Sequence, residues 1–245
     1  MPPNDNLRNI NHSYPFPFPY PVIKYSKYDF GAIIMKKCII FCAAEFDAPV
    51  EAISSEDFVI AADGGLRHTK ALGITPNEVL GDFDSLGFVP AGANVFPVEK
   101  DDTDAMLAAR RGLELGFREF WFYGSLDGPR LDHTVANFQT LQFLADRGAA
   151  GYLIGKNQMV TALKDGTLRF PAGREGTLSV FCLGPDARGV TLRGLYYPLQ
   201  NGTLIPGFPL GVSNHFTGEP AEISVKNGSL LVIWDKAAGF PHFRA

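Results

Sequence analysis

The sequence predicts an α/β protein in two parts, a mainly parallel sheet with flanking helices followed by an antiparallel β-sandwich. Between residue 38 and about residue 155, short apolar runs alternate with segments of helical periodicity, which is typical of a parallel sheet covered by helices. After about residue 156, the apolar runs are separated by Gly, Pro and Asn turns, and no helix-length periodic segment occurs. We therefore expect an α/β domain at 35–155 and a β-sandwich domain at 156–245.

The first 34 residues differ in composition from the rest of the chain. Prolines at positions 15, 17, 19 and 21 alternate with aromatic residues, which favours extended backbone over helix. We expect residues 1–34 to form a disordered extension. Met35 directly precedes two lysines and the first strongly apolar run, so we further hypothesise that translation begins there.

The individual elements follow from the same patterns. In the first part, apolar side chains recur at helical spacing over 104–115 and 133–147, which we predict to be helices. The predicted strands of this part are 38–44, 58–62, 78–81, 94–98, 119–123 and 151–154. Those of the second part are 177–183, 189–197, 221–225 and 229–234. Ligands of open parallel sheets bind beyond the carboxyl ends of the strands, so the residues that follow the first set of runs are the first candidates for a site.

Composition excludes several classes of protein. The net charge of −4 argues against a general nucleic-acid-binding protein, which usually carries a basic face. No apolar run approaches the roughly 20 residues that cross a bilayer, and the N-terminus has no basic-then-apolar signal. The three cysteines lack the spacing of a zinc site, which favours free thiols in a reducing compartment. We therefore expect a cytoplasmic protein that binds neither nucleic acid nor membrane.

Carboxylates and glycines follow four of the predicted strands in the first part. Because the carboxyl ends of parallel strands meet at one edge of a sheet, we expect these residues to converge there. An arginine and a threonine lie among them, the threonine directly before a predicted helix. The candidates are Asp63, Gly64, Gly65, Asp82, Asp84, Asp101, Asp102, Thr103, Asp104, Arg130 and Asp132.

This acidic edge favours metal-assisted phosphate chemistry. Asp82 and Asp84 are two residues apart, so in extended backbone they point to the same side and can share a metal ion. Hard oxygen ligands suit Mg²⁺, which takes further ligands from substrate phosphates, and without a cation the carboxylates would repel one another. Helix N-termini expected at Thr103 and His133 would offer amide donors to phosphate.

Each of these segments also has a purely structural explanation. Asp63 with its two glycines is a common turn, while Thr103 and Asp132 suit helix caps. Asp82 and Asp84 are harder to explain in this way, because two acids at a strand end do not favour folding unless something neutralises them. Taken together at matched strand ends, the acids favour a functional site. The sequence lacks the glycine-rich lysine motif of P-loop kinases, which excludes that class.

The ordered set of motifs resembles thiamine pyrophosphokinases over about residues 36–235. The sequence departs from the family at Pro129, which lies in a Gly-Pro-Arg segment where the family usually has Gly-Gly-Arg. Proline has no amide N–H, so any contact of that amide with phosphate is lost here. The motifs are Asp63-Gly64-Gly65, Gly81-Asp82-Phe83-Asp84-Ser85, Lys100-Asp101-x-Thr103-Asp104, Arg130-x-Asp132-His133, Gly194-Leu195-Tyr196-Tyr197-Pro198-Leu199, Gly211-Val212-Ser213-Asn214 and Gly228-Ser229-Leu230-Leu231-Val232-Ile233-Trp234.

The resemblance implies that the α/β domain at 35–155 binds nucleotide and metal and that the β-sandwich domain at 156–245 binds substrate. It implies a homodimer in which thiamine lies between the acidic domain of one subunit and the β domain of the other. It implies transfer of the β,γ-pyrophosphoryl group of ATP to the thiamine hydroxyl, which gives thiamine diphosphate and AMP. For Trp234, simple core packing stays open as an alternative to stacking on thiamine. The implied roles are Mg²⁺ binding by Asp82, Asp84 and Asp104, orientation or deprotonation of the hydroxyl by Asp63 or Asp132, ATP binding by Gly64, Gly65, Lys100, Asp101, Thr103 and Arg130, and thiamine binding by Ser213, Asn214 and Trp234.

Two other functions remain open. The nearest is a related pyrophosphokinase that acts on a hydroxymethylpterin, since the acidic edge would serve either alcohol and only Ser213 and Asn214 favour thiamine. The other is a non-catalytic metal–nucleotide sensor, which would bind ATP without turnover. The complete set of acids gives no reason to expect such a loss of activity.

Overall fold

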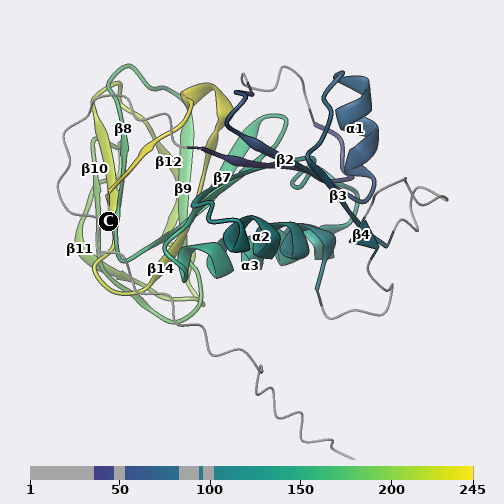
Figure 1. Ribbon diagram of the computed structural model, residues 1–245. Coiled ribbons are helices and arrows are strands. Elements are labelled where there is room, and N and C mark those ends of the chain that lie inside the picture. Colours follow the sequence, from purple (N-terminus) through teal and green to yellow (C-terminus); the bar gives the residue numbers. More distant parts are fainter. Residues whose placement is uncertain (1–35, 47–52, 83–93, 96–101, 245) are drawn as a thin grey trace, which may run out of the picture.

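The fold, seen in a computed structural model, consists of two sheets and three α-helices in the described part of the chain, residues 36–46, 53–82, 94–95 and 102–244 (Figure 1). A ten-stranded sheet has the order β12-β9-β14-β7-β6-β5-β1-β2-β3-β4, and a five-stranded sheet has the order β11-β10-β13-β8-β15. Strands β1 to β6 pair in parallel, whereas all other pairings are antiparallel. The predicted α/β fold with an antiparallel second part is confirmed.

The α/β part follows the predicted elements closely. The predicted helix at 133–147 begins two residues earlier than expected, and α1 was not predicted because seven residues are too few for a periodic pattern. The strands are β1 (Cys38–Phe41), β2 (Phe58–Ala62), β3 (Glu78–Gly81), β4 (Asn94–Val95), β5 (Glu119–Tyr123) and β6 (Ala150–Ile154), and the helices are α1 (Gly65–Ala71), α2 (Asp104–Glu114) and α3 (Leu131–Ala145). No described helix is long and apolar enough to span a membrane.

The second part contains nine strands and one short 3₁₀ helix within its described residues. The four predicted strands are present as β9, β10, β13 and β14. Because β7 pairs with β6, the antiparallel strands β7, β14, β9 and β12 extend the parallel sheet and make one layer of the sandwich. The elements are β7 (Gln158–Lys164), β8 (Thr167–Phe170), β9 (Thr177–Cys182), β10 (Ala187–Arg193), β11 (Leu199–Leu204), β12 (Gly211–His215), β13 (Ala221–Ser224), β14 (Ser229–Asp235), η1 (Lys236–Ala238) and β15 (His242–Arg244).

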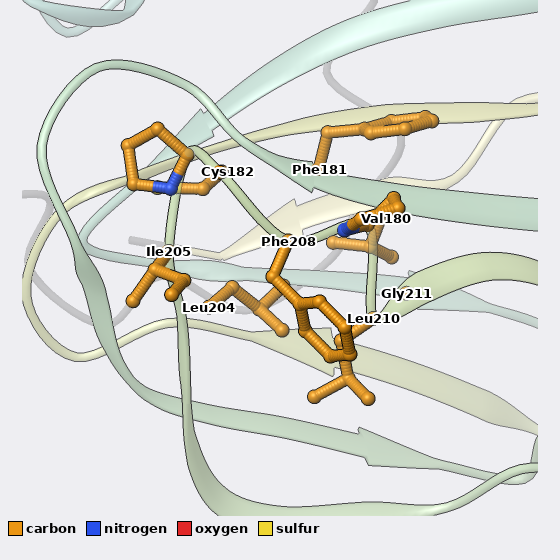
Figure 2. Close-up of a pocket in the computed structure, with 11 residues that line it drawn as sticks. Val180, Phe181, Cys182, Leu204, Ile205, Phe208, Leu210 and Gly211 are labelled. Carbon is orange, nitrogen blue, oxygen red and sulfur yellow. The ribbon is translucent and has the colours of Figure 1, made fainter.

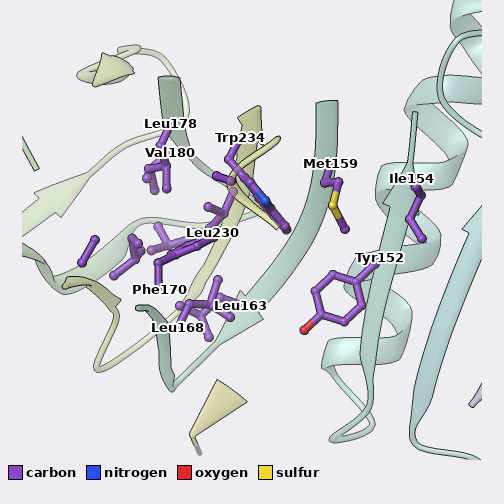
Figure 3. Packing of buried hydrophobic residues seen from close by; sticks show 14 of the residues in the cluster. Tyr152, Ile154, Met159, Leu163, Leu168, Phe170, Leu178, Val180, Leu230 and Trp234 are labelled. Carbon is purple, nitrogen blue, oxygen red and sulfur yellow. The ribbon is translucent and has the colours of Figure 1, made fainter. Parts of the chain in front are cut away.

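Two hydrophobic cores lie on opposite faces of the large sheet. Along β1, Ile39 and Phe41 belong to one core, while Cys38 and Ile40 belong to the other, as the alternation of side chains in a strand requires. The second core packs the sheet against α2 and α3, which lie together on one face (Figure 1). The first core continues into the sandwich, where side chains from β6, β7, β8, β9 and β14 interdigitate (Figure 3). The carboxyl strand ends of the α/β part therefore belong to a sheet that has a hydrophobic core on each face.

Candidate functional site

Three of the predicted acids meet at the carboxyl edge of the parallel sheet. Asp63 follows β2, Asp82 follows β3, and Asp104 is the first residue of α2. One carboxylate oxygen from each lies within 4.8 Å of the other two. The backbone N–H of Asp63 donates to the carbonyl oxygen of Leu80 at 2.8 Å, which fixes the end of β2 beside that of β3. The three carboxylates thus offer oxygen ligands at a spacing that suits one hard divalent cation.

The backbone at Asp63 is shaped to bring its side chain into this cluster. Its φ of 46° lies in the left-handed region, which Asp adopts more readily than most side chains, and the residue is only 7% exposed. Gly81 lies against it, since a Cβ at Gly81 would stand 3.1 Å from the Cα of Asp63. The turn after β2 therefore requires a small residue at the end of β3, and Gly81 supplies it.

The two glycines after Asp63 differ in what the fold requires of them. A Cβ at Gly65 would lie 1.8 Å from the carbonyl oxygen of Phe41, so only glycine lets α1 pack this closely against β1. Gly64 has φ −57° and caps the start of α1. Close packing is therefore a sufficient reason for Gly65, and contacts of Gly64 and Gly65 with ATP stay a prediction.

Thr103 has the role of a helix cap in this structure. Its hydroxyl oxygen accepts the N–H of Met106 at 3.2 Å, at the N-terminus of α2. Asp104 lies in the first turn, where the helix dipole favours negative charge. This cap sets the start of α2 at the acidic edge of the sheet and places Asp104 beside Asp63 and Asp82. The N-terminus expected at Thr103 is confirmed.

Arg130 and Asp132 form an exposed pair after β5. The Arg130 guanidinium donates to both Asp132 oxygens, at 2.6 and 3.3 Å, and this holds the pKa of Asp132 below its usual value. The expectation that the helix begins at His133 was wrong, because α3 begins at Leu131 and Arg130 itself occupies the cap position. Asp132 consequently lies inside the first turn and does not cap the helix.

Three predicted site residues fall outside the described part of the chain. They are Asp84, Lys100 and Asp101. Their assignments to metal or ATP therefore stay predictions.

In the β domain, Ser213 and Asn214 differ sharply in their surroundings. Ser213 is exposed, has a φ of 58°, and lies where the pairing of β12 with β9 shifts register. Its backbone N–H donates to the hydroxyl oxygen of Ser179 at 3.0 Å. Asn214 is only 3% exposed and its side chain is bonded to the backbone of Tyr197. Ser213 is thus presented to solvent by a bulge, while Asn214 is turned inward.

Trp234 lies in the core and presents no face to a ligand. It is 0% exposed, its indole N–H donates to the carbonyl oxygen of Gly239 at 2.9 Å, and its ring packs edge-on against Phe170 (Figure 3). Core packing therefore explains this residue, and the prediction that thiamine stacks on Trp234 was wrong. A strand with buried side chains on both faces hides any aromatic residue it carries.

Three exposed rings near Ser213 were not predicted as site residues. Tyr196 and Tyr197 are 65% and 58% exposed, and their ring centroids lie 4.9 Å apart. The exposed His215 ring lies 6.1 Å from that of Tyr196 and 6.3 Å from that of Tyr197. The sequence signal that could have indicated these residues is the pair of adjacent tyrosines between Gly194 and Pro198. We call Tyr196, Tyr197 and His215 the aromatic cluster.

The acids and the aromatic cluster lie far apart within one chain. Strands β9, β14, β7, β6, β5, β1 and β2 separate β12 from β3 in the large sheet. At about 4.8 Å per strand this corresponds to roughly 40 Å along the sheet. Figure 1 shows β12 on the side of the sandwich and β3 beside α1, across the molecule. A small heterocyclic alcohol cannot touch both regions of the same chain.

An apolar hollow of about 290 Å³ lies near the edge strand β12 (Figure 2). Its lining comes from β9 and from the loop between β11 and β12, including Cys182, Ile205 and Phe208. Several side chains of this loop and of β12 are exposed although apolar: Ile205, Phe208, Leu210 and Val212. The hollow lacks carboxylates and is separate from the acidic edge.

Comparison with known proteins connects both regions to one family. Residues 50–151 match the model described as thiamin pyrophosphokinase, catalytic domain, and residues 167–230 match thiamin pyrophosphokinase, vitamin B1 binding domain. The thiamine pyrophosphokinase of Bacillus subtilis is 29% identical over 184 residues, which cover 71% of this chain and 85% of that protein.

Solved structures agree with these matches. The crystal structure of thiamine pyrophosphokinase from Bacillus subtilis has a TM-score of 0.73 at 25% identity and covers 82% of this chain and 99% of that one. The Candida albicans structure of that name has a TM-score of 0.64 at 16% identity, covers 82% and 89%, and supports the fold alone. The two domain models, the relative and the shared fold show that the chain belongs to the thiamine pyrophosphokinase family of enzymes.

Proposed function

We propose that the chain transfers the β,γ-pyrophosphoryl group of ATP to the hydroxyl of thiamine, giving thiamine diphosphate and AMP. The observation that carries the proposal is the convergence of Asp63, Asp82 and Asp104 at the carboxyl edge of the parallel sheet, in a chain of this family. The acids alone support metal-assisted phosphate chemistry on either alcohol. Family membership favours thiamine over a hydroxymethylpterin and favours an enzyme over a sensor.

The residues present suit Mg²⁺, because three carboxylate oxygens leave room for water and phosphate oxygens as further ligands. Asp63, Asp82 and Asp104 would hold the ion, with Asp84 as a further proposed ligand. When bound, Mg²⁺ offsets the charge of the triphosphate and fixes its position. The three acids would otherwise repel the substrate, so we expect turnover to require a divalent cation.

The protein's own residues would bind ATP and orient the hydroxyl. Arg130, at the N-terminus of α3, would donate to phosphate oxygens, with Lys100 and Asp101 as further proposed ATP contacts. The hydroxyl oxygen attacks the β-phosphorus, AMP leaves, and the hydroxyl proton passes to a carboxylate. That carboxylate is proposed to belong to Asp63 or Asp132. The Arg130 guanidinium lowers the pKa of Asp132, which makes Asp132 a poorer proton acceptor than an unpaired carboxylate.

We further propose a homodimer in which each site combines two chains. The separation of roughly 40 Å between β12 and β3 supports this, since the acids of one chain and the aromatic cluster of the same chain cannot share one thiamine. In a two-fold dimer, each contact between the two chains occurs once in each direction, so two equivalent composite sites result. Ser213 and the aromatic cluster would then contact the thiamine whose hydroxyl faces the partner's acids.

The reaction is tested by chromatography of products formed from ATP, Mg²⁺ and thiamine. We expect equimolar AMP and thiamine diphosphate, with no product when the metal is chelated. A hydroxymethylpterin offered in place of thiamine should give no AMP. Formation of ADP with thiamine monophosphate, or ATP binding without any product, would overturn the proposed reaction.

The exposed apolar side chains around β12 give a prediction for the dimer. Leu210 is 53% exposed next to Phe208 and Val212, so we propose that these side chains pack against the partner. Leu210→Glu should halve the particle mass measured by light scattering and abolish turnover. Leu115→Glu is the matched control, because Leu115 is 41% exposed at the end of α2 and should leave both properties unchanged. If Leu210→Glu stays dimeric with normal turnover, these side chains do not form the dimer interface.

A reducing compartment completes the proposal. The three cysteines are free, and Cys38 and Cys42 are buried in the core of the α/β part. Burial raises the pKa of the Cys42 thiol to about 12, so it stays protonated and unreactive. We accordingly propose a cytoplasmic location.

A further inference from the structure

The buried side chain of Asn214 makes three hydrogen bonds, all of them to backbone groups. Its amide Nδ2–H donates to the carbonyl oxygen of Tyr197 at 2.7 Å. Its Oδ1 accepts the N–H of Tyr197 and the N–H of His215, both at 2.9 Å. With both acceptor lone pairs used and 3% exposure, this side chain has little left to offer a ligand.

These bonds attach the loop before β11 to the edge strand β12. Tyr196 adds a donor, since its N–H bonds the carbonyl oxygen of His215 at 3.0 Å, and Leu195 forms an isolated bridge with Phe216. The backbone of the aromatic cluster is therefore fixed at both chain segments, while the rings of Tyr196 and Tyr197 remain mostly exposed. Exposed rings on a fixed backbone make a preorganised surface for a flat cationic heterocycle.

We propose that Asn214 is a positioning residue for the substrate: it acts through the backbone of Tyr197 and does not itself contact thiamine. The effect on substrate rests on the proposed function, whereas the attachment of the loop does not. Removing the Asn214 amide takes away the partners of the N–H and the carbonyl of Tyr197 at a part-buried place, which loosens the loop. Thiamine would then bind to a less ordered aromatic cluster, and its binding would weaken while the acids stay in place.

The first measurement is backbone hydrogen exchange in the ligand-free protein. In Asn214→Ala, the Tyr197 amide should exchange about tenfold faster, because it loses its acceptor. Ser213→Ala is the matched control, since Ser213 is the exposed neighbour and its hydroxyl makes none of these bonds. Unchanged exchange at Tyr197 in a folded Asn214→Ala protein would overturn the proposal, whatever the protein catalyses.

The second measurement separates KM from kcat. Asn214→Ala should raise the KM for thiamine about tenfold and leave kcat within about twofold, as expected for lost binding of substrate. In a Tyr197→Ala background, the same change should raise KM less than about twofold, because the ring it positions is already absent. An equal rise in both backgrounds would indicate direct contact and overturn the proposal.

Asn214→Asp, which is close to asparagine in size, serves as a second variant in case Asn214→Ala does not fold. Asn214→Asp keeps both acceptor bonds but places a carboxylate oxygen against the carbonyl oxygen of Tyr197, which repels it, so its KM should also rise above that of wild type. A KM equal to wild type would count against the proposal. Absence of any thiamine turnover by the wild type would refute the proposed function instead, and hydrogen exchange would still decide the role of Asn214.

Discussion

Asp82→Asn should reduce turnover by on the order of a hundredfold to a thousandfold, the size seen when one directly placed electrostatic group is removed. Asp82 contributes one of three carboxylate oxygens that lie within 4.8 Å of one another, so an amide there removes charge from the proposed metal site. The fold should survive, because Asp82 is half-buried at a strand end and its loss relieves repulsion among like charges. Steady-state turnover and thermal unfolding measure the two effects separately.

The control for this change lies at the far end of α2. Glu114→Gln also turns a carboxylate into an amide, but ten residues along the helix from Asp104, which is about 15 Å. It should leave turnover unchanged. We also expect Asp82→Asn to need more Mg²⁺ for half of its residual activity. Normal turnover in a folded Asp82→Asn protein would remove the acidic cluster from the mechanism, and a lower unfolding temperature with normal turnover would make Asp82 a structural residue.

Mixed dimers of two inactive chains should recover activity. One chain carries Asp82→Asn, and the other carries Tyr196→Ala with Tyr197→Ala. In a composite dimer, the acids of the second chain meet the aromatic cluster of the first, so one of the two sites is intact. Purified mixed dimers should therefore have about half of wild-type activity, while each parent alone is nearly inactive. Differently tagged chains and tandem affinity purification provide the sample.

A second mixture tests the geometry of this recovery. Dimers of Asp82→Asn with Asp104→Asn should stay inactive, because every site then contains a damaged acidic half. If the second mixture recovers activity as well as the first, activity does not depend on one intact acidic half, and the composite site is wrong. If neither mixture recovers although mixed dimers are isolated, the whole site lies within one chain.

The α/β half of the fold could be predicted because its signals are local. Each parallel strand is a short apolar run bounded by turn residues, and α2 carries a clear periodic face. Two of the missed strands lack such a run: β11 is exposed at three of its six residues, and β12 has two exposed residues before the buried Asn214. An edge strand is held mainly by backbone pairing, which the side-chain pattern does not reveal. The missed strand β7 does contain five buried residues in a row, which were not predicted to form a strand.

The candidate site also has a part that the sequence predicts and a part that it does not. The sequence by itself determined the acids, because Asp63 and Asp82 directly follow strands and parallel strands end at one edge, so chain order already brings them together. Only the tertiary structure decided which residues of the proposed thiamine-binding surface face solvent. Burial turned Trp234 from a predicted ligand contact into a core residue, and a bulge in β12 sent Asn214 inward to Tyr197 while Ser213 faces solvent. Which face a side chain takes depends on register and on the second layer packed above it, and neither is encoded within a short motif.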